Sequence, residues 1–189
     1  MNRRTLTMLS DLEHRSEGEK KYISGYFAVF NSIYQICPGI SESIAPGAFD
    51  ETINDDIRCL IDHESRLVLG RTKAGTYKLR IDKKGLWGEV EINEKDSDAM
   101  NLYHRVKRRD VDQCSIAFEI LQDSCEYRED GSCHWTIEKL KLYEGTVCTF
   151  PAYEETSVEA RTRQKEHIEK RQLEQKKAEL SRRLEELKC

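Results

Sequence analysis

The sequence lacks a long hydrophobic run. Nowhere does it approach the roughly 20 consecutive apolar residues that a membrane-spanning helix requires. At the start of the chain, residues 1–9 meet Ser10 and Asp11 before the apolar region of a signal peptide develops. We therefore expect a soluble protein that is not exported and has no membrane partner.

Positive charge is scarce in most of the chain. The first 159 residues contain 21 Lys or Arg against 29 Asp or Glu, whereas the last 30 residues contain 10 against 6. A nucleic-acid-binding domain neutralises phosphates with clustered cations, which so acidic a body does not supply. The composition therefore argues against nucleic acid as a partner.

Paired cysteine motifs are also missing. The seven cysteines include no C-x-x-C pair, and their odd number fits reduced thiols in a cytosolic protein. Cys125, Cys133 and His134 lack the C-x₂₋₄-C and H-x₃₋₅-H spacings of zinc sites. A two-residue turn at 130–131 would moreover pair Cys125 with Thr136. We expect no metal ion and no cofactor.

The last 30 residues differ from the rest of the chain. Sixteen of the residues 160–189 are charged, none is Gly or Pro, and leucines recur every seven residues at Leu173, Leu180 and Leu187. This pattern predicts a charged helix with a narrow apolar stripe. Association with a partner helix, including that of a second copy, and a solvated helix both remain open.

The preceding residues, 21–159, are of a size for one domain and are rich in strand patterns. Apolar and charged residues alternate on both sides of a turn at 82–85, which predicts a hairpin over 77–92. Further strands are expected at 22–30, 57–62, 114–121 and from 135 onward, and a short helix after Pro46. A second helix, capped by Asp96 or Ser97 and ending at 107–109, should bury Ala99, Leu102, Tyr103 and Val106. These elements predict a β-rich α+β fold, a barrel or sandwich-like body. Residues 1–20 are polar and unpatterned, which predicts a mobile segment.

Few side chains are candidates for chemistry. His63 follows a short strand and lies between two carboxylates, where a base can project from the edge of the scaffold. Ser115 lies inside a strand without a surrounding G-x-S-x-G, so the hydrolase elbow is excluded. By alternation, Cys114 points into the apolar face, where a thiol stays neutral. Glu144 could face the same cavity as Ser115 or solvent, and spacing leaves both open.

Several short blocks occur in a fixed order between residues 22 and 161. They are GYFAVFN at 25–31, IAPGAF at 44–49, His63 followed by LGRT at 69–72 and GT at 75–76, DV at 110–111 with SIAF at 115–118, and YE at 143–144 with TFPAY at 149–153. Together they resemble the prohead serine proteases of tailed bacteriophages, the caudovirus capsid-maturation proteases. Blocks that occur together in this order are far more specific than any single motif.

The resemblance implies a site and a fold. It assigns Ser115 as the nucleophile, because the family's Ser-Phe-Gly-Phe block falls on 115–118, and His63 as the base. It places Glu144 at the third catalytic position. Two family glycines are replaced here, by Ala117 and by Arg109. The implied fold is a herpesvirus-protease-like β-barrel with surrounding short helices, to which the C-terminal charged helix is added.

The resemblance also implies a biological role. The expected substrates are the scaffolding segment of the major capsid protein and the protease itself, cut inside the assembling procapsid in the host cytoplasm. The charged helix would tether the enzyme to helical scaffold and be removed later by self-cleavage. Two other hypotheses stay open: a catalytically silent capsid-assembly or scaffolding protein, and a cysteine hydrolase that uses Cys114, which the side-chain alternation disfavours.

Overall fold

The structure, a computed structural model, describes residues 4–9, 12–128 and 132–149 and, toward the C-terminus, 170, 173–174, 176–178 and 180–183. The chain divides into two units, Met1–Tyr153 and Glu154–Cys189. The described residues of the second unit are helical and exposed, including Leu173 and Leu180. Leu187 and residues 160–169 of the expected helix lie outside the described residues. None of the described helices is long and apolar enough to cross a bilayer.

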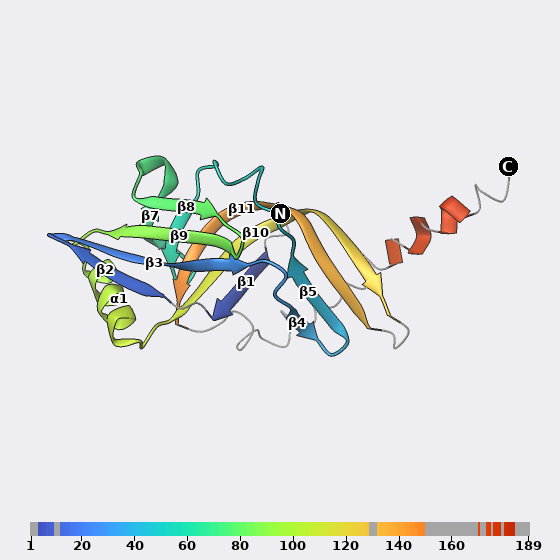
Figure 1. Cartoon of the computed structure of the whole chain (residues 1–189), viewed down its shortest axis with the longest axis horizontal. Helices are drawn as coiled ribbons and strands as arrows, with labels where there is room; N and C mark the ends of the chain where they lie inside the picture. The colour runs from blue at the N-terminus through green and yellow to red at the C-terminus, as the bar shows by residue number, and fades with distance from the viewer. Residues whose placement is uncertain are drawn as a thin grey trace. The chain divides into compact units, whose positions relative to one another are not determined.

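Eleven strands form two sheets in the described part of the first unit (Figure 1). The larger sheet has the order β1-β10-β11-β5-β4, with β6 also paired to β11 and β7 to β6. Its strands are β1 (Arg4–Leu9), β4 (Tyr34–Cys37), β5 (Ile40–Ile44), β6 (Arg58–Ile61), β7 (Glu64–Arg71), β10 (Gln113–Tyr127) and β11 (Cys133–Cys148). The smaller sheet has the order β2-β3-β9-β8. Its strands are β2 (Glu13–Glu17), β3 (Lys20–Val29), β8 (Tyr77–Ile81) and β9 (Gly85–Ile92).

The expected β-rich α+β fold is confirmed at this level. Helices are few in the described part of the first unit, which has a 3-10 turn, η1 (Thr72–Ala74), and one α-helix, α1 (Ser97–Arg108). The pairings among residues 4–9, 12–128 and 132–149 build two sheets and do not close either of them into a barrel. The two sheets share one core, to which β3, β8 and β9 contribute from one side and β6, β10 and β11 from the other.

The most local predictions are confirmed. Strands β8 and β9 form the hairpin expected over 77–92. Asp96 caps α1, because its carboxylate accepts hydrogen bonds from the backbone N–H groups of Asp98 and Ala99. The helix buries the four residues that its periodicity selects, Ala99, Leu102, Tyr103 and Val106. It ends at Arg109, which has the left-handed φ of 65° that favours glycine, the residue the family pattern has at this position.

The helix expected after Pro46 is wrong, since residues 46–54 form successive turns. Gly47 has a φ of 91°, which a helix cannot include. Backbone N–H groups of β11 also bond to this segment. Leu140 donates its N–H to the Ala48 carbonyl, and Leu142 donates its N–H to Thr52 Oγ1. The turns are therefore fitted to β11 instead of continuing as a helix.

Two further segments differ from expectation. Tyr127 pairs with Cys133 and Cys125 with Trp135, so the predicted pairing of Cys125 with Thr136 is wrong by one residue. The connection therefore has one residue more than a two-residue loop, and residues 130–131 themselves lie outside the described residues. Within residues 1–20, for which the sequence predicts mobility, the backbone forms β1 and β2. The partner of β1 is the distant strand β10, which a local pattern does not reveal. The partner of β2 is β3, which follows it after the two-residue turn at 18–19.

Candidate active site

His63 lies in a tight turn of the larger sheet. Ile61 of β6 pairs with Glu64 of β7, so Asp62 and His63 form a two-residue hairpin loop. Both have positive φ values, 46° and 60°, as the two central residues of a type I′ turn require. Asp and His are among the non-glycine residues found most often at positive φ, although the conformation is uncommon for any of them. The turn places the imidazole at the end of the hairpin, as the position of His63 after a strand suggested.

The imidazole connects two side chains from other strands. His63 Nε2 lies 2.9 Å from Ser115 Oγ of β10, and His63 Nδ1 lies 2.7 Å from Glu144 Oε1 of β11. A carboxylate can only accept, so we assign the proton to Nδ1, which then donates to Glu144. Nε2 is left to accept the Ser115 hydroxyl. The structure thus brings together all three residues that the resemblance names, and Glu144 faces Ser115 and His63 instead of solvent.

Strand register explains why these side chains meet. Ser115 pairs with Thr146, and Ala117 pairs with Glu144. Directly paired residues share one face of a sheet, so Ser115, Thr146 and Glu144 lie on the face opposite the core side chains. The register then shifts, because Phe118 pairs with Leu142. Tyr143 is the extra residue of this bulge, which changes the direction of β11 next to Glu144.

The three side chains differ in exposure. Ser115 is 0% exposed and the Glu144 side chain 7%, whereas 26% of the His63 side chain is exposed. Burial strengthens the hydrogen bond between His63 and Glu144, because little water competes for it. It also means that the atoms covering Ser115 must move before a substrate can reach the hydroxyl oxygen.

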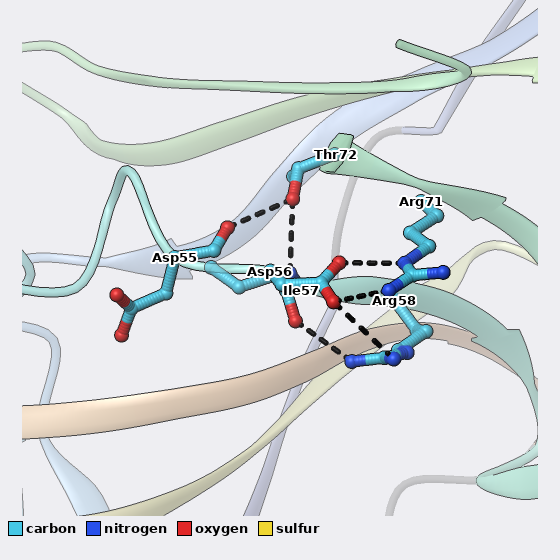
Figure 2. A network of polar contacts seen from close by, with 6 residues as sticks. All are labelled: Asp55, Asp56, Ile57, Arg58, Arg71 and Thr72. Carbon is cyan, nitrogen blue, oxygen red and sulfur yellow. Dashed lines mark hydrogen bonds and ion pairs between the residues drawn. The ribbon is translucent and has the colours of Figure 1, made fainter. Parts of the chain in front are cut away.

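The hairpin that carries His63 is anchored at its open end (Figure 2). Asp56 forms ion pairs with both Arg58 of β6 and Arg71 of β7. The hydrogen bond from Arg71 is the largest cause that lowers the pKa of Asp56, and the same bond raises the pKa of Arg71. Thr72 Oγ1 accepts the N–H of Ile57 at 2.9 Å. These contacts hold the two strands together at the end opposite His63.

The cysteines near the site are poor nucleophiles. Cys114 is fully buried in the core, on the face predicted by alternation. Burial, with Asp62 and Asp112 as further causes, raises the pKa of Cys148 to about 12. Burial also raises the pKa of Cys59. Thiols held protonated in this way react slowly. The cysteine hydrolase hypothesis is disfavoured because Cys114 itself is 0% exposed and lies in the core.

Of the residues considered for zinc, Cys125 and Cys133 interact with each other through their side chains, whereas His134 bonds to β5. His134 lies between two hydroxyls, with Nδ1 2.8 Å from Ser41 Oγ and Nε2 2.8 Å from Ser43 Oγ. Both imidazole nitrogens therefore contact serines of β5. Among residues 4–9, 12–128 and 132–149, no three His, Cys, Asp or Glu side chains gather in a way that could hold a metal ion.

Sequence reasoning missed Thr146 of this site, and it considered Asp62 only as a carboxylate beside His63. Thr146 Oγ1 accepts the backbone N–H of His63 at 3.1 Å, and the Asp62 carboxylate accepts the N–H of Thr149 at 2.8 Å. Neither contact has a local signal, because each joins residues more than 80 positions apart. The pairing of β6 with β11 is what brings them together.

Comparison with known proteins identifies the family. Residues 10–171, which include every residue of the site, match the Caudovirus prohead serine protease family. The chain belongs to this family. The resemblance found in the sequence blocks is therefore confirmed. The prohead protease of Enterobacteria phage HK97 is 25% identical over 155 residues, which cover 80% of this chain and 64% of that relative. The chain of this prohead protease family member thus spans less than two thirds of the relative's length, and no solved structure matches it.

Proposed function

We propose that this chain is a serine endopeptidase that cleaves the scaffolding segment of the major capsid protein, and itself, during procapsid maturation. One observation carries the proposal: Ser115, His63 and Glu144 form a continuous line of two hydrogen bonds inside the region that matches the family. Hydroxyl, imidazole and carboxylate in this order are the parts of a nucleophile-activating triad.

The geometry supports acyl transfer to water. Ser115 Oγ attacks the peptide carbonyl carbon while its proton passes to His63 Nε2, which is 2.9 Å away. Glu144 holds the Nδ1–H tautomer and stabilises the imidazolium that forms. The proton then moves to the amine as the C–N bond breaks, which leaves an acyl-enzyme. Water, deprotonated by the same imidazole, releases the second product.

The biological setting completes the proposal. The family's role supports action on capsid proteins inside the assembling procapsid, in the host cytoplasm. We assign residues 21–159 to the protease domain and 160–189 to a tail that tethers the enzyme to helical scaffold. The exposure of Leu173 and Leu180 supports a helix available for such contacts or for self-association.

The test is cleavage of the capsid protein by purified full-length chain, followed by intact mass. We expect wild type to shorten the capsid protein and Ser115→Ala to leave it whole, because the alanine lacks the attacking oxygen. Ser124→Ala, on the distant part of β10, is the matched control and is expected to cleave normally. Equal cleavage by wild type and Ser115→Ala would refute a serine enzyme. No cleavage by either, with procapsids still assembling, would favour the catalytically silent scaffold protein.

Glu144→Gln is expected to slow cleavage but to leave more activity than Ser115→Ala. The amide keeps the size of the side chain but removes the charge that stabilises the imidazolium, and it can present its N–H₂ group to Nδ1 and so favour the wrong tautomer. By analogy with a triad whose acidic residue is changed, the loss in kcat is about 10⁴-fold. Steady-state kinetics measure it. An unchanged kcat would move the orienting role away from Glu144, with Asp62 and Glu64 the next carboxylates to test.

A further inference from the structure

We propose that Asp62 and Thr146 are positioning residues that hold the backbone of His63 in its left-handed conformation and thereby direct its imidazole toward Ser115. This inference rests on the proposed serine protease function. It adds two residues to the reaction, neither of which contacts the substrate or the reacting atoms. Three features of the molecule support it: the conformation of the turn, the bonds that hold the turn, and the strand to which those bonds lead.

The conformation of His63 needs support from outside the turn. A non-glycine residue in the left-handed region costs on the order of 1 kcal/mol or more, and two occur here in succession, at Asp62 and His63. Such residues persist where the surrounding structure determines them more strongly than their own preference does. A relaxed His63 would move its ring away from both of its hydrogen-bonding partners.

Three hydrogen bonds supply that support. The N–H of His63 donates to Thr146 Oγ1 at 3.1 Å, and the N–H of Asp62 donates to the Val147 carbonyl at 3.0 Å. The N–H of Thr149 donates to Asp62 Oδ1 at 2.8 Å. Both backbone N–H groups of the loop are therefore bonded, and the side chain of Asp62 is bonded as well. The Asp62 carboxylate bonds to the backbone that follows β11, whereas the Glu144 carboxylate bonds to the imidazole and orients it.

All three bonds lead to the end of one strand. Thr146, Val147 and Thr149 follow Glu144 closely along β11 and its continuation. The backbone and the ring of His63 are therefore both fixed relative to β11, and Thr146 is itself the register partner of Ser115. Because Thr146 is 0% exposed, its hydroxyl has no water to bond in place of His63. Removing this hydroxyl takes away the acceptor of the His63 N–H at a place that water does not reach.

The experiment uses the full chain and a fluorophosphonate probe, which forms a bond between Ser115 Oγ and phosphorus as fluoride leaves and the serine proton passes to His63. The rate of labelling therefore reports activation of Ser115 without a known substrate. The variants are Thr146→Val, which keeps the shape and removes the acceptor, and Thr146→Ser, which keeps the acceptor. Asp62→Gly keeps the turn conformation and removes the bond to Thr149, whereas Asp62→Asn keeps both. Thr136→Val on the same strand is the control.

We expect Thr146→Val to label about 100-fold more slowly, the effect of a misplacement of about 1 Å. Thr146→Ser should recover most of the rate, and Asp62→Gly should be slower than Asp62→Asn. A second readout does not depend on activity: the low-field proton resonance of His63 Nδ1–H, expected to weaken in Thr146→Val and to persist in Thr146→Ser and Thr136→Val. Thermal melting shows which variants remain folded.

The outcomes separate the two proposals. In one outcome, wild type is labelled at Ser115 while folded Thr146→Val has the same labelling rate, the same pH dependence of labelling and the same His63 resonance. That result refutes the positioning role and leaves the proposed protease function intact. A variant that merely melts earlier, with unchanged rate and resonance in the folded state, refutes the positioning role equally. If wild type is not labelled, the proposed function fails, and the resonance alone decides whether Thr146 positions His63.

Discussion

His63→Ala is expected to abolish cleavage while the first unit stays folded. The imidazole contacts both Ser115 and Glu144, so its loss leaves the hydroxyl without its base. In a triad that acts as a unit, removing the base costs about as much as removing all three members, roughly 10⁶-fold in kcat. Stability should change little, since His63 lies in a hairpin loop outside the core.

A matched variant shows whether the effect is specific. His104→Ala replaces an exposed histidine of α1 and is expected to cleave capsid protein at the wild-type rate. Cleavage by intact mass and thermal melting should be measured on all three proteins. Near wild-type cleavage by His63→Ala would overturn the assignment of the base. A large drop in melting temperature would instead assign His63 to the packing of the fold.

Gly145→Ala is expected to destabilise the first unit and to impair the active site by displacing β11. A Cβ at this position would lie 2.7 Å from a ring carbon of Phe27 and collide with the hydroxyl of Tyr77, both in the smaller sheet. Overpacking of this kind costs about 3 kcal/mol when rigid rings must move. Glu144 and Thr146 flank Gly145, so a displaced β11 also lowers kcat in the protein that remains folded.

Urea unfolding measures the loss of stability. Gly18→Ala is the comparison, because nothing lies within 4 Å of a Cβ there and only the positive φ of 60° opposes the alanine. We expect that variant to lose about 1 kcal/mol. If Gly145→Ala were no less stable than Gly18→Ala, the close packing of the two sheets behind the active site would be disproved.

Sequence reasoning succeeds where the determining interactions are local. The hairpin of β8 and β9 follows from alternation on both sides of its turn, and α1 follows from an Asp96 cap with apolar residues at helical spacing. It fails for the turns at 46–54, whose backbone groups bond to β11, and for β1, which pairs with a strand more than 100 residues later. In both cases a tertiary partner overrides local propensity.

The residues of the active site show the same difference between local and tertiary signals. Ser115, His63 and Glu144 could be predicted from the sequence, because each lies in one of the ordered blocks that resemble the family. Thr146 could not be predicted, and Asp62 was considered only as a carboxylate beside His63, because each acts through a contact between distant strands that its residue type does not reveal. The alternation rule places Ser115 opposite the core correctly, but it does not show that Ser115 is itself buried between two paired strands.

The parallel pairing of β6 with β11 has a consequence for when the enzyme can first act. It joins Arg58 to Glu144 and Ile61 to Val147, so it closes late in any chain that folds while it is being synthesised. A nascent chain that has emerged as far as β10 already contains His63 and Ser115, yet it lacks the strand that holds them together. Such non-local pairings form slowly even after synthesis ends. The order of the strands therefore delays assembly of the Ser115, His63 and Glu144 site until β11 has been synthesised and has paired with β6.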